Sequence, residues 1–279
     1  MDKVIDKRNK LNDLSGKEWI VETKSFFFQK GLGANSKEAK YEKMHPAPFS
    51  YTDISRLIKF FTKKGNKVLD PFLGVGSTIK ACIELEREGY GVEINSHWCD
   101  LTKERLLKEC KFKINSNHLI CDDSKHLLKH YEKNYFDFIV TSPPYWNILN
   151  KEKDYKAKER ITNGYVTKYS ENNELDLGNI KNYDNFLDSV VNIFFQCYDV
   201  LKPEKYMCII VSDFRHKSEF ISYHSDLIQR MTKGKSKKFI LNGIKILVQN
   251  AKKLYPYGYP FSYVENIHHQ YVLIFKKPK

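Results

Sequence analysis

The sequence predicts an α/β fold in which helices cover both faces of a mostly parallel sheet. Between residues 51 and 144, short apolar runs typical of strands alternate with longer segments of helical periodicity. Repeated strand–helix–strand units of this length form parallel sheets. The chain has 279 residues, of which 41% are hydrophobic, enough for a sizeable core. We find no internal repeat and no interdomain linker, so a single domain spanning 1–279 is the simplest organisation.

The predicted helices show apolar residues on one face. Four apolar residues between 54 and 61 recur at helical spacing, and Gly65 ends that pattern. A later, strongly apolar helix is expected to stop at Pro203. In chain order, helices are predicted at 51–65, 78–89, 96–112, 124–134 and 185–203.

The predicted strands are short apolar runs between these helices. The last two flank a segment rich in proline, glycine and tyrosine, and they are expected to close the sheet as an antiparallel pair. Strands are predicted at 66–72, 90–95, 118–123, 136–144, 206–214, 239–250 and 269–277.

Three segments fall outside this regular pattern. Residues 1–50 are polar, and their aromatic cluster within 25–50 reads as loop with some anchoring. Residues 146–183 and 213–238 are lysine-rich and are predicted as loop inserts. Long loops inside a compact domain are usually functional.

Composition favours a cytoplasmic protein without membrane spans or a metal site. The chain has no run of 18 apolar residues, and the N-terminal residues are charged and polar, unlike a signal peptide. The six cysteines show neither a Cys-x-x-Cys pair nor a metal-ligand spacing with histidine. They are expected to be free thiols.

The formal charge of +13 favours a polyanionic partner, with nucleic acid as the leading candidate. Most of the excess is lysine. The alternative is therefore that an AT-rich genome raises the lysine content everywhere.

A glycine turn follows the first strand of the regular region. Gly74 and Gly76 lie where glycine lets the backbone bend tightly and approach a ligand. Ile79 replaces the third glycine of a dinucleotide fingerprint, which disfavours a nicotinamide cofactor. Glu93 ends the next strand 19 residues after Gly74, close to the spacing of a ribose-hydroxyl acceptor. The pattern indicates a nucleoside-containing cofactor.

A second pair of acidic residues ends the following strand. Asp122 and Asp123 lie at the edge where open α/β sheets bind ligands, and one carboxylate, assigned to Asp122, is expected to accept from an adenine amino group. A tight structural turn is the alternative for the glycines alone, but the acidic residues at successive strand ends disfavour it.

The segment TSPPY, ending at Tyr145, follows a predicted buried strand, where a rigid corner with an aromatic plug would be the ordinary explanation. Together, LDPFLGVGST and TSPPY resemble the paired motifs of the DNA methyltransferases that methylate exocyclic amines. Those enzymes use S-adenosyl-L-methionine to methylate N4 of cytosine or N6 of adenine. HPAPFS, which begins at His45, is similar to a cofactor motif of the same family. The resemblance covers 17–276, with the motifs in a gamma-like order.

This resemblance implies a Rossmann-like, seven-stranded methyltransferase sheet. It also implies two groups of site residues. The implied catalytic residues are Ser142, Pro143, Pro144 and Tyr145. The implied cofactor-binding residues are His45, Phe49, Asp70, Phe72, Gly74, Gly76, Ser77, Thr78, Glu93 and Asp122.

The chemistry of amine methylation explains why such a turn is needed. The lone pair of an exocyclic amine is delocalised into the ring, so acceptors aimed at its hydrogens must draw the nitrogen toward tetrahedral geometry. The Ser142 hydroxyl and the Pro143 carbonyl can supply them. Tyr145 offers a flat face for an extracted base. Aromatic rings can also stabilise the sulfonium of the cofactor, with Phe49, Phe72 and Tyr145 as candidates.

The expected partner is double-stranded DNA with a flipped target base. The two inserts would contact phosphates, although either could equally be a solvated loop. No separate target-recognition domain is evident, so recognition would come from the inserts, from a homodimer or from a partner chain. A cognate restriction enzyme encoded alongside would be a further partner. The aromatic segment ending in His268 and His269 is either a base-contacting or strand-separating surface or core packing.

The target base is expected to be cytosine, modified at N4. Ser142 at the first position of the turn is typical of the cytosine-N4 enzymes, whereas Asp or Asn is commoner in the adenine-N6 enzymes. An adenine-N6 enzyme, an RNA amino-methyltransferase and a catalytically inactive nucleic-acid-binding module are the alternatives.

Overall fold

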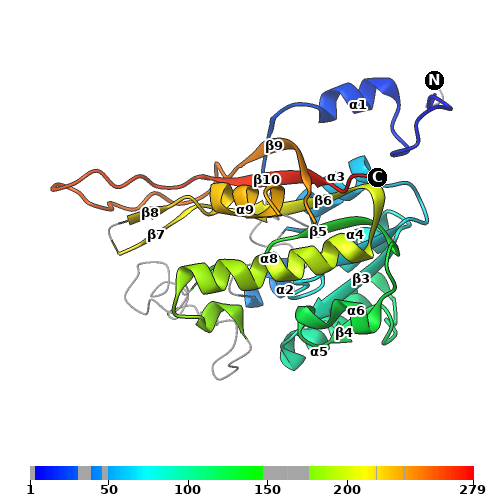
Figure 1. Ribbon diagram of the computed structural model, residues 1–279, viewed down its shortest axis with the longest axis horizontal. Helices are drawn as coiled ribbons and strands as arrows, with labels where there is room; N and C mark the ends of the chain where they lie inside the picture. Colours follow the sequence, from blue (N-terminus) through cyan, green and yellow to red (C-terminus); the bar gives the residue numbers. More distant parts are fainter. Residues whose placement is uncertain are drawn as a thin grey trace.

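The computed structural model describes residues 4–30, 39–45, 50–146, 162, 176–217, 219–234 and 237–279. They form an α/β structure around an eight-stranded sheet of order β1-β9-β10-β6-β5-β2-β3-β4 (Figure 1). Its strands are β1 (Phe26–Phe28), β2 (Lys67–Asp70), β3 (Glu88–Glu93), β4 (Leu119–Cys121), β5 (Phe136–Thr141), β6 (Leu201–Val211), β9 (Ile240–Val248) and β10 (His269–Lys276).

The topology confirms the predicted fold class. Strands β4, β3, β2, β5 and β6 pair in parallel, and β10 pairs antiparallel with both β6 and β9. The two C-terminal strands therefore form the predicted antiparallel pair, although β1 lies beyond β9 at the edge of the sheet.

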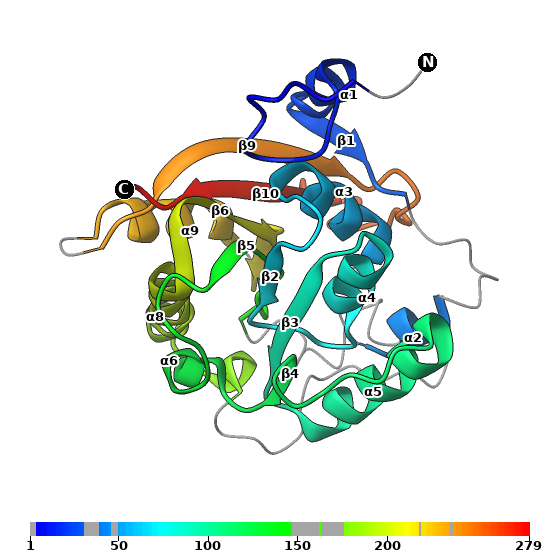
Figure 2. The same ribbon diagram turned by 90° about the vertical axis from the view of Figure 1, so that its right-hand side faces the viewer.

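Helices cover both faces of the sheet. In Figure 2, α3, α4 and α5 lie on one side, and α6, α8 and α9 lie on the other. The helices are α1 (Gly16–Glu22), α2 (Ala39–Met44), α3 (Tyr51–Phe61), α4 (Ser77–Glu84), α5 (Ser96–Cys110), α6 (Leu127–His130), α8 (Tyr183–Val200) and α9 (Tyr223–Thr232), with 3-10 turns η1 (Ser124–His126) and η2 (Leu177–Asn179). Among the described residues, no helix has the length and apolar character to cross a membrane.

Alternation along the strands divides the core between the two faces. In β5, Ile139 packs into the cluster that contains α8, whereas Phe138 and Val140 pack with α3. In β6, Ile209 packs into the cluster that contains α8, and Ile210 packs into the cluster that contains α3. A strand with both faces buried is continuously apolar, which is why these segments could be recognised as central strands.

The structure corrects three predictions of local structure. Phe26–Phe28, expected as loop, forms the edge strand β1, which adds an eighth strand parallel to β9. The segment 213–238, expected as a loop insert, contains the hairpin of β7 (Phe214–His216) and β8 (Glu219–Ile221) and the helix α9. Most of the other insert, 146–183, lies outside the described residues.

The third correction concerns Pro203. It does not end α8, which already stops at Val200, but lies within β6. The β5–β6 register shifts at this point, so that Phe136 pairs with Leu201 and Phe138 with Tyr206. Proline is tolerated at such an irregularity because no ladder hydrogen bond requires its missing N–H.

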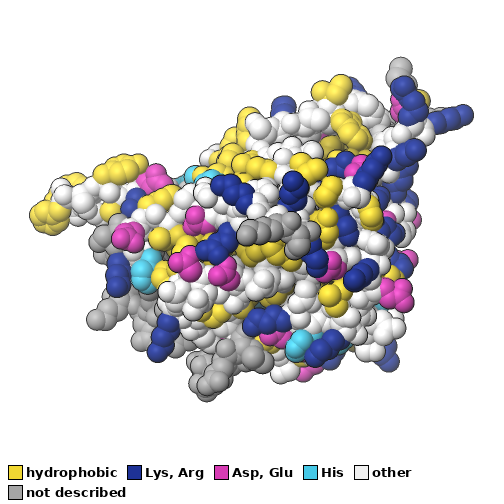
Figure 3. Space-filling view, viewed as in Figure 1, with side chains coloured by type: hydrophobic (Ala, Val, Ile, Leu, Met, Phe, Trp, Pro, Cys, Tyr) yellow, Lys and Arg dark blue, Asp and Glu magenta, His cyan; other side chains and the backbone are white. Residues whose placement is uncertain are grey.

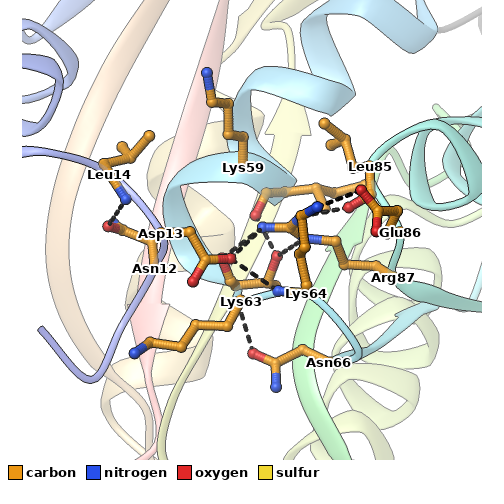
Figure 4. A network of polar contacts seen from close by, with 12 residues as sticks. Asn12, Asp13, Leu14, Lys59, Lys63, Lys64, Asn66, Leu85, Glu86 and Arg87 are labelled. Atoms are coloured by element: carbon orange, nitrogen blue, oxygen red, sulfur yellow. Dashed lines mark hydrogen bonds and ion pairs between the residues drawn. The ribbon is translucent and has the colours of Figure 1, made fainter. Parts of the chain in front are cut away.

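Arg87 anchors the N-terminal segment to the sheet (Figure 4). Its guanidinium donates to the Thr62 hydroxyl and carbonyl, both at 3.0 Å, and to Asp13 at 3.3 Å. The Asn12 amide donates to the Phe60 carbonyl at 2.6 Å. These contacts hold residues 12–14 against the end of α3 just before β2.

Gly91 in β3 should tolerate no side chain. A Cβ there would lie 2.5 Å from Leu73 Cδ2, whereas a Cβ at Gly243 in β9 would meet no atom within 4 Å. We expect Gly91→Ala to lower the free energy of unfolding by about 1–3 kcal/mol, because Leu73 is buried and must shift. Gly243→Ala is the matched control, expected to stay within about 0.5 kcal/mol of wild type. Urea denaturation measures the free energy of unfolding of both variants. Equal losses would show that close packing of Gly91 against Leu73 does not contribute to stability.

Candidate functional site

The candidate site is a pocket at the carboxyl ends of β2, β3 and β5, the edge where ligands bind in open α/β sheets. Its empty volume, including the solvent space at its open mouth, is about 970 Å³. It is lined by His45, Ile54, Asp70, Pro71, Phe72, Leu73, Gly74, Val75, Ser77, Val92, Glu93, Ile94, Asn95, Trp98, Asp123, Ser124, Ser142, Pro144, Asp176, Leu177 and Ile193.

The glycine turn forms one wall of the pocket. Gly74 and Gly76 have φ angles of 56° and 78°, which only glycine adopts readily. A Cβ at Gly74 would lie 3.3 Å from His45 Nε2, and one at Gly76 would lie 2.6 Å from Thr102 Cγ2. Gly74 thus presents bare backbone to the pocket, whereas Gly76 lets the turn pack against α5.

Helix α5 supports this turn from behind. The Thr102 hydroxyl donates to the Gly74 carbonyl at 3.1 Å. Arg105, fully buried, donates through Nη1 to the Val75 carbonyl and to the Ser77 hydroxyl, each at 3.0 Å. Its charge is paired with Glu42 at 3.2 Å and Glu109 at 3.1 Å. Sequence reasoning missed these residues because helical periodicity alone does not reveal what a buried polar side chain contacts.

Asp70 joins the helix after the glycine turn to the end of β5. Its carboxylate accepts from Thr141 Oγ1 at 2.6 Å, Thr78 Oγ1 at 2.5 Å and the Phe72 N–H at 3.0 Å. Burial raises the pKa of Asp70 to about 6, and the hydrogen bonds from the two threonines and Phe72 act in the opposite direction. Thr78 was predicted to bind cofactor, but it serves this contact and does not line the pocket.

Glu93 holds the turn closed and faces the pocket. It accepts from the Gly74 N–H at 2.8 Å and from the Asn95 N–H at 2.9 Å. Burial raises the pKa of Glu93 to about 7, and the nearby carboxylates of Asp70 and Asp176 add to the effect. A carboxylate has about four acceptor positions, so Glu93 retains capacity for ligand hydroxyls.

The structure places Asp123, not Asp122, in the pocket. Asp122 turns outward to His126 Nδ1 at 3.0 Å and His130 Nε2 at 2.7 Å, contacts that lower the pKa of its carboxyl, His130 having the larger effect. Asp123 is 8% exposed and lines the pocket, with one oxygen accepting from the Lys125 N–H at the start of η1. The cofactor role predicted for Asp122 stays a prediction, but the pocket lining favours Asp123 for that role, because a strand end does not fix which of two adjacent carboxylates turns inward.

The Ser-Pro-Pro-Tyr turn opens into the same pocket. Ser142 and Pro144 line it, whereas Pro143 is buried behind them. The Ser142 hydroxyl has no hydrogen-bond partner among the described residues. The Tyr145 hydroxyl accepts from the Ser212 N–H at 3.0 Å and from Gln270 Nε2 at 3.3 Å, which fixes the ring against β6 and β10.

Further wall residues come from segments that carry no recognisable motif. Trp98 on α5 packs edge-on against His45, with 5.1 Å between ring centroids. Buried Asp176 caps η2, where it accepts from the Gly178 N–H at 2.9 Å. Neither was predicted.

Phe49, predicted to bind cofactor, lies outside the described residues. In the described part of the chain, no cluster of three His, Cys, Asp or Glu side chains suits a metal ion, and the six cysteines are free thiols.

Comparison with known proteins identifies the family. The sequence model of the N6/N4 DNA methylases, described as "DNA methylase", matches residues 3–104 and 136–279. The chain belongs to this family. The cofactor is S-adenosyl-L-methionine.

Individual relatives match only segments of this chain. The Type II methyltransferase M.SmaI of Serratia marcescens is 38% identical over 26% of this chain and 25% of its own length. M.MjaI of Methanocaldococcus jannaschii is 47% identical over 18% of this chain and 17% of its own length. The matched part therefore spans about a quarter or less of these curated relatives. The structure of TrmN from Thermus thermophilus shares the fold, with a TM-score of 0.50 at 14% identity, over 81% of this chain and 48% of its own.

The raised pKa of Asp70 predicts a pH-dependent cost in stability. A carboxyl whose pKa is higher in the folded than in the unfolded state loses folded-state stability as pH rises between the two values. Asp70→Asn keeps acceptor and donor groups for Thr141 and Thr78 but cannot ionise. Relative to this variant, wild type should lose roughly 2 kcal/mol of unfolding free energy between about pH 4 and pH 7. Urea denaturation of both proteins over this range provides the measurement, and a constant difference would rule out ionisation of Asp70.

Proposed function

We propose that this DNA methylase transfers a methyl group from S-adenosyl-L-methionine to N4 of cytosine in double-stranded DNA, with the target base flipped out of the helix. The observation that carries the proposal is the shared pocket. Ser142 and Pro144 line the same cavity as Gly74 and Glu93, so the turn that would orient an amine faces the wall that would hold the methyl donor.

The pocket residues fit the cofactor by their chemistry. Glu93 would accept from the ribose hydroxyls, and Asp123 from the adenine amino group. The bare backbone of Gly74 leaves room that a Cβ would fill. Phe72 and Trp98 provide aromatic faces on the walls. The bound cofactor supplies an electrophilic methyl group on a sulfonium, and the protein's own groups must orient the amine toward it.

The turn after β5 provides that orientation. The Ser142 hydroxyl would accept one amine hydrogen and the Pro143 carbonyl the other, which restores lone-pair density on the nitrogen. Because its own hydroxyl is held by Ser212 and Gln270, the Tyr145 ring cannot swing freely, so it suits a stacking surface for an extracted base.

Ser142 favours cytosine N4 over adenine N6. A neutral hydroxyl is a weaker acceptor than a carboxylate, so this site would depend more on the proline carbonyl and on alignment with the cofactor. The Type II methyltransferase names of its relatives suggest that the protein acts in a restriction–modification system with a cognate endonuclease. Recognition by the basic inserts or by a homodimer remains part of the proposal.

The activity is tested by the product formed on nucleic acid. Incubation with labelled S-adenosyl-L-methionine and duplex DNA should yield N4-methylcytosine in digested DNA by mass spectrometry. Ser142→Ala should lower the rate by about ten- to a hundredfold with little change in cofactor affinity, because it removes one acceptor. Bulk RNA is the control substrate. Label found only in RNA would overturn DNA as the substrate, and N6-methyladenine as sole product would overturn the choice of base.

The cofactor assignment is tested by two adjacent isosteric variants. Asp123→Asn keeps a side-chain oxygen for η1 but loses the charged acceptor in the pocket, so S-adenosyl-L-methionine affinity should fall by about 1–2 kcal/mol. Asp122→Asn is the matched control, because Asp122 faces His126 and His130 and its change should leave affinity within about twofold. Isothermal titration calorimetry measures both. A larger loss for Asp122→Asn would restore the original assignment.

A further inference from the structure

The segment between β9 and β10 forms a projecting arm, residues 249–268. Figure 1 shows it extending well beyond the body of the molecule, beside the β7–β8 hairpin. In the space-filling view its far end carries mainly apolar side chains (Figure 3). The cofactor pocket does not explain why the arm carries these apolar side chains, since no residue of the arm lines that pocket.

The root of the arm is held in a defined shape. Asn266 exchanges two hydrogen bonds with the Tyr255 backbone, at 2.9 Å to its N–H and 2.8 Å to its carbonyl. Lys252 Nζ donates to the Ile267 carbonyl at 2.6 Å, and the Gln249 N–H donates to the His268 carbonyl at 2.8 Å. Bonds between the two sides of the root fix the direction in which the arm projects.

The arm exposes large side chains that a soluble surface normally hides. Leu254 is 76% exposed, Tyr259 80%, Phe261 94% and Tyr263 84%. The backbone N–H groups of Phe261 and Ser262 both donate to the Gly258 carbonyl, so the turn itself needs none of these side chains. A group of exposed large apolar side chains indicates a binding partner.

The arm leaves the protein at the catalytic edge of the sheet. Because β10 is antiparallel to both β6 and β9, the end of β9 and the start of β10 lie at the same edge as the ends of β5 and β6. Gln270, two residues beyond the arm, donates to the Tyr145 hydroxyl at 3.3 Å. A substrate large enough to reach past the catalytic turn would therefore meet the arm.

Duplex DNA suits this combination of features better than another protein surface. The chain has a formal charge of +13, and Lys252 and Lys253 lie at the root, where a phosphate backbone would pass. The arm is a narrow projection (Figure 1), and its exposed side chains are largely aromatic. This is the form of a wedge that enters between base pairs, rather than the flat patch of a protein interface. Wedge insertion supplies the unstacking that base extraction requires.

We propose that the arm inserts Phe261 and Tyr263 into the target duplex beside the base that enters the pocket. This inference rests on the proposed function and adds to it the element that opens the double helix. Phe261 and Tyr263 would replace stacking lost when the base leaves, and Tyr145 would receive the base on the other side.

The test compares two DNA substrates that carry the methylated sequence found in the product assay. One is fully paired, and in the other the target base faces an abasic site, so that little unstacking is needed. The double variant Phe261→Ser/Tyr263→Ser should lose at least about tenfold in kcat/KM on the paired duplex and less than about twofold on the abasic one. Leu107→Ser is the matched control and should match wild type on both substrates. Leu107 is 55% exposed and belongs to α5, a helix that lies away from the arm in Figure 1.

The possible results separate the arm from the underlying function. Equal losses on both substrates, or no loss on either, would overturn the wedge while leaving DNA methylation intact. Sedimentation that shows a wild-type dimer and a monomeric double variant would assign the tip to contact between two copies and would also overturn it. A wild type inactive on both substrates would instead refute the proposed function. Fluorescence of 2-aminopurine placed beside the target base should rise with wild type and not with the double variant.

Discussion

The buried carboxylate of Asp70 is the contact on which the rest of the site depends. It lies at the end of β2 and binds Thr78 on the helix after the glycine turn and Thr141 at the end of β5. Thr141 directly precedes Ser142. One side chain thus fixes the distance between the wall assigned to the cofactor and the turn assigned to the amine. Methyl transfer requires such a fixed distance, because small displacements of the reacting atoms have a large effect on rate.

The same arrangement concentrates acidic groups in a partly dry space. Asp70 and Glu93 have raised pKa values chiefly because burial disfavours their ionised forms, and Asp176 adds to the effect at Glu93. Burial of these carboxyls therefore carries an electrostatic cost that a ligand rich in hydrogen-bond donors would relieve. A nucleoside with ribose hydroxyls and an amino group is a ligand of this kind. The same buried carboxyls that lower the stability of the folded protein would then raise its affinity for such a ligand.

The glycine turn owes its shape to residues far away in the sequence. Thr102 and Arg105 hold the carbonyls of Gly74 and Val75 from behind, and Gly76 is required because Thr102 occupies the place of its side chain. The buried charge of Arg105 is compensated by Glu42 and Glu109, which links α2 to the same helix. Rigid support of this kind leaves the backbone of the turn available to a ligand.

The sequence by itself determined the order of elements between residues 51 and 144, the parallel sheet with its antiparallel end, the glycine turn and the Ser-Pro-Pro-Tyr turn. These features depend on local periodicity and on the conformations of glycine and proline. Both are set by residues that lie close together in the sequence. Only the tertiary structure decided that Asp123 and not Asp122 faces the pocket, that Phe26–Phe28 adds an edge strand and that Trp98 and Asp176 complete the walls. The direction of a side chain at a strand end, and the pairing of a short strand, depend on partners that are distant in sequence. These distant partners come together only when the sheet has formed.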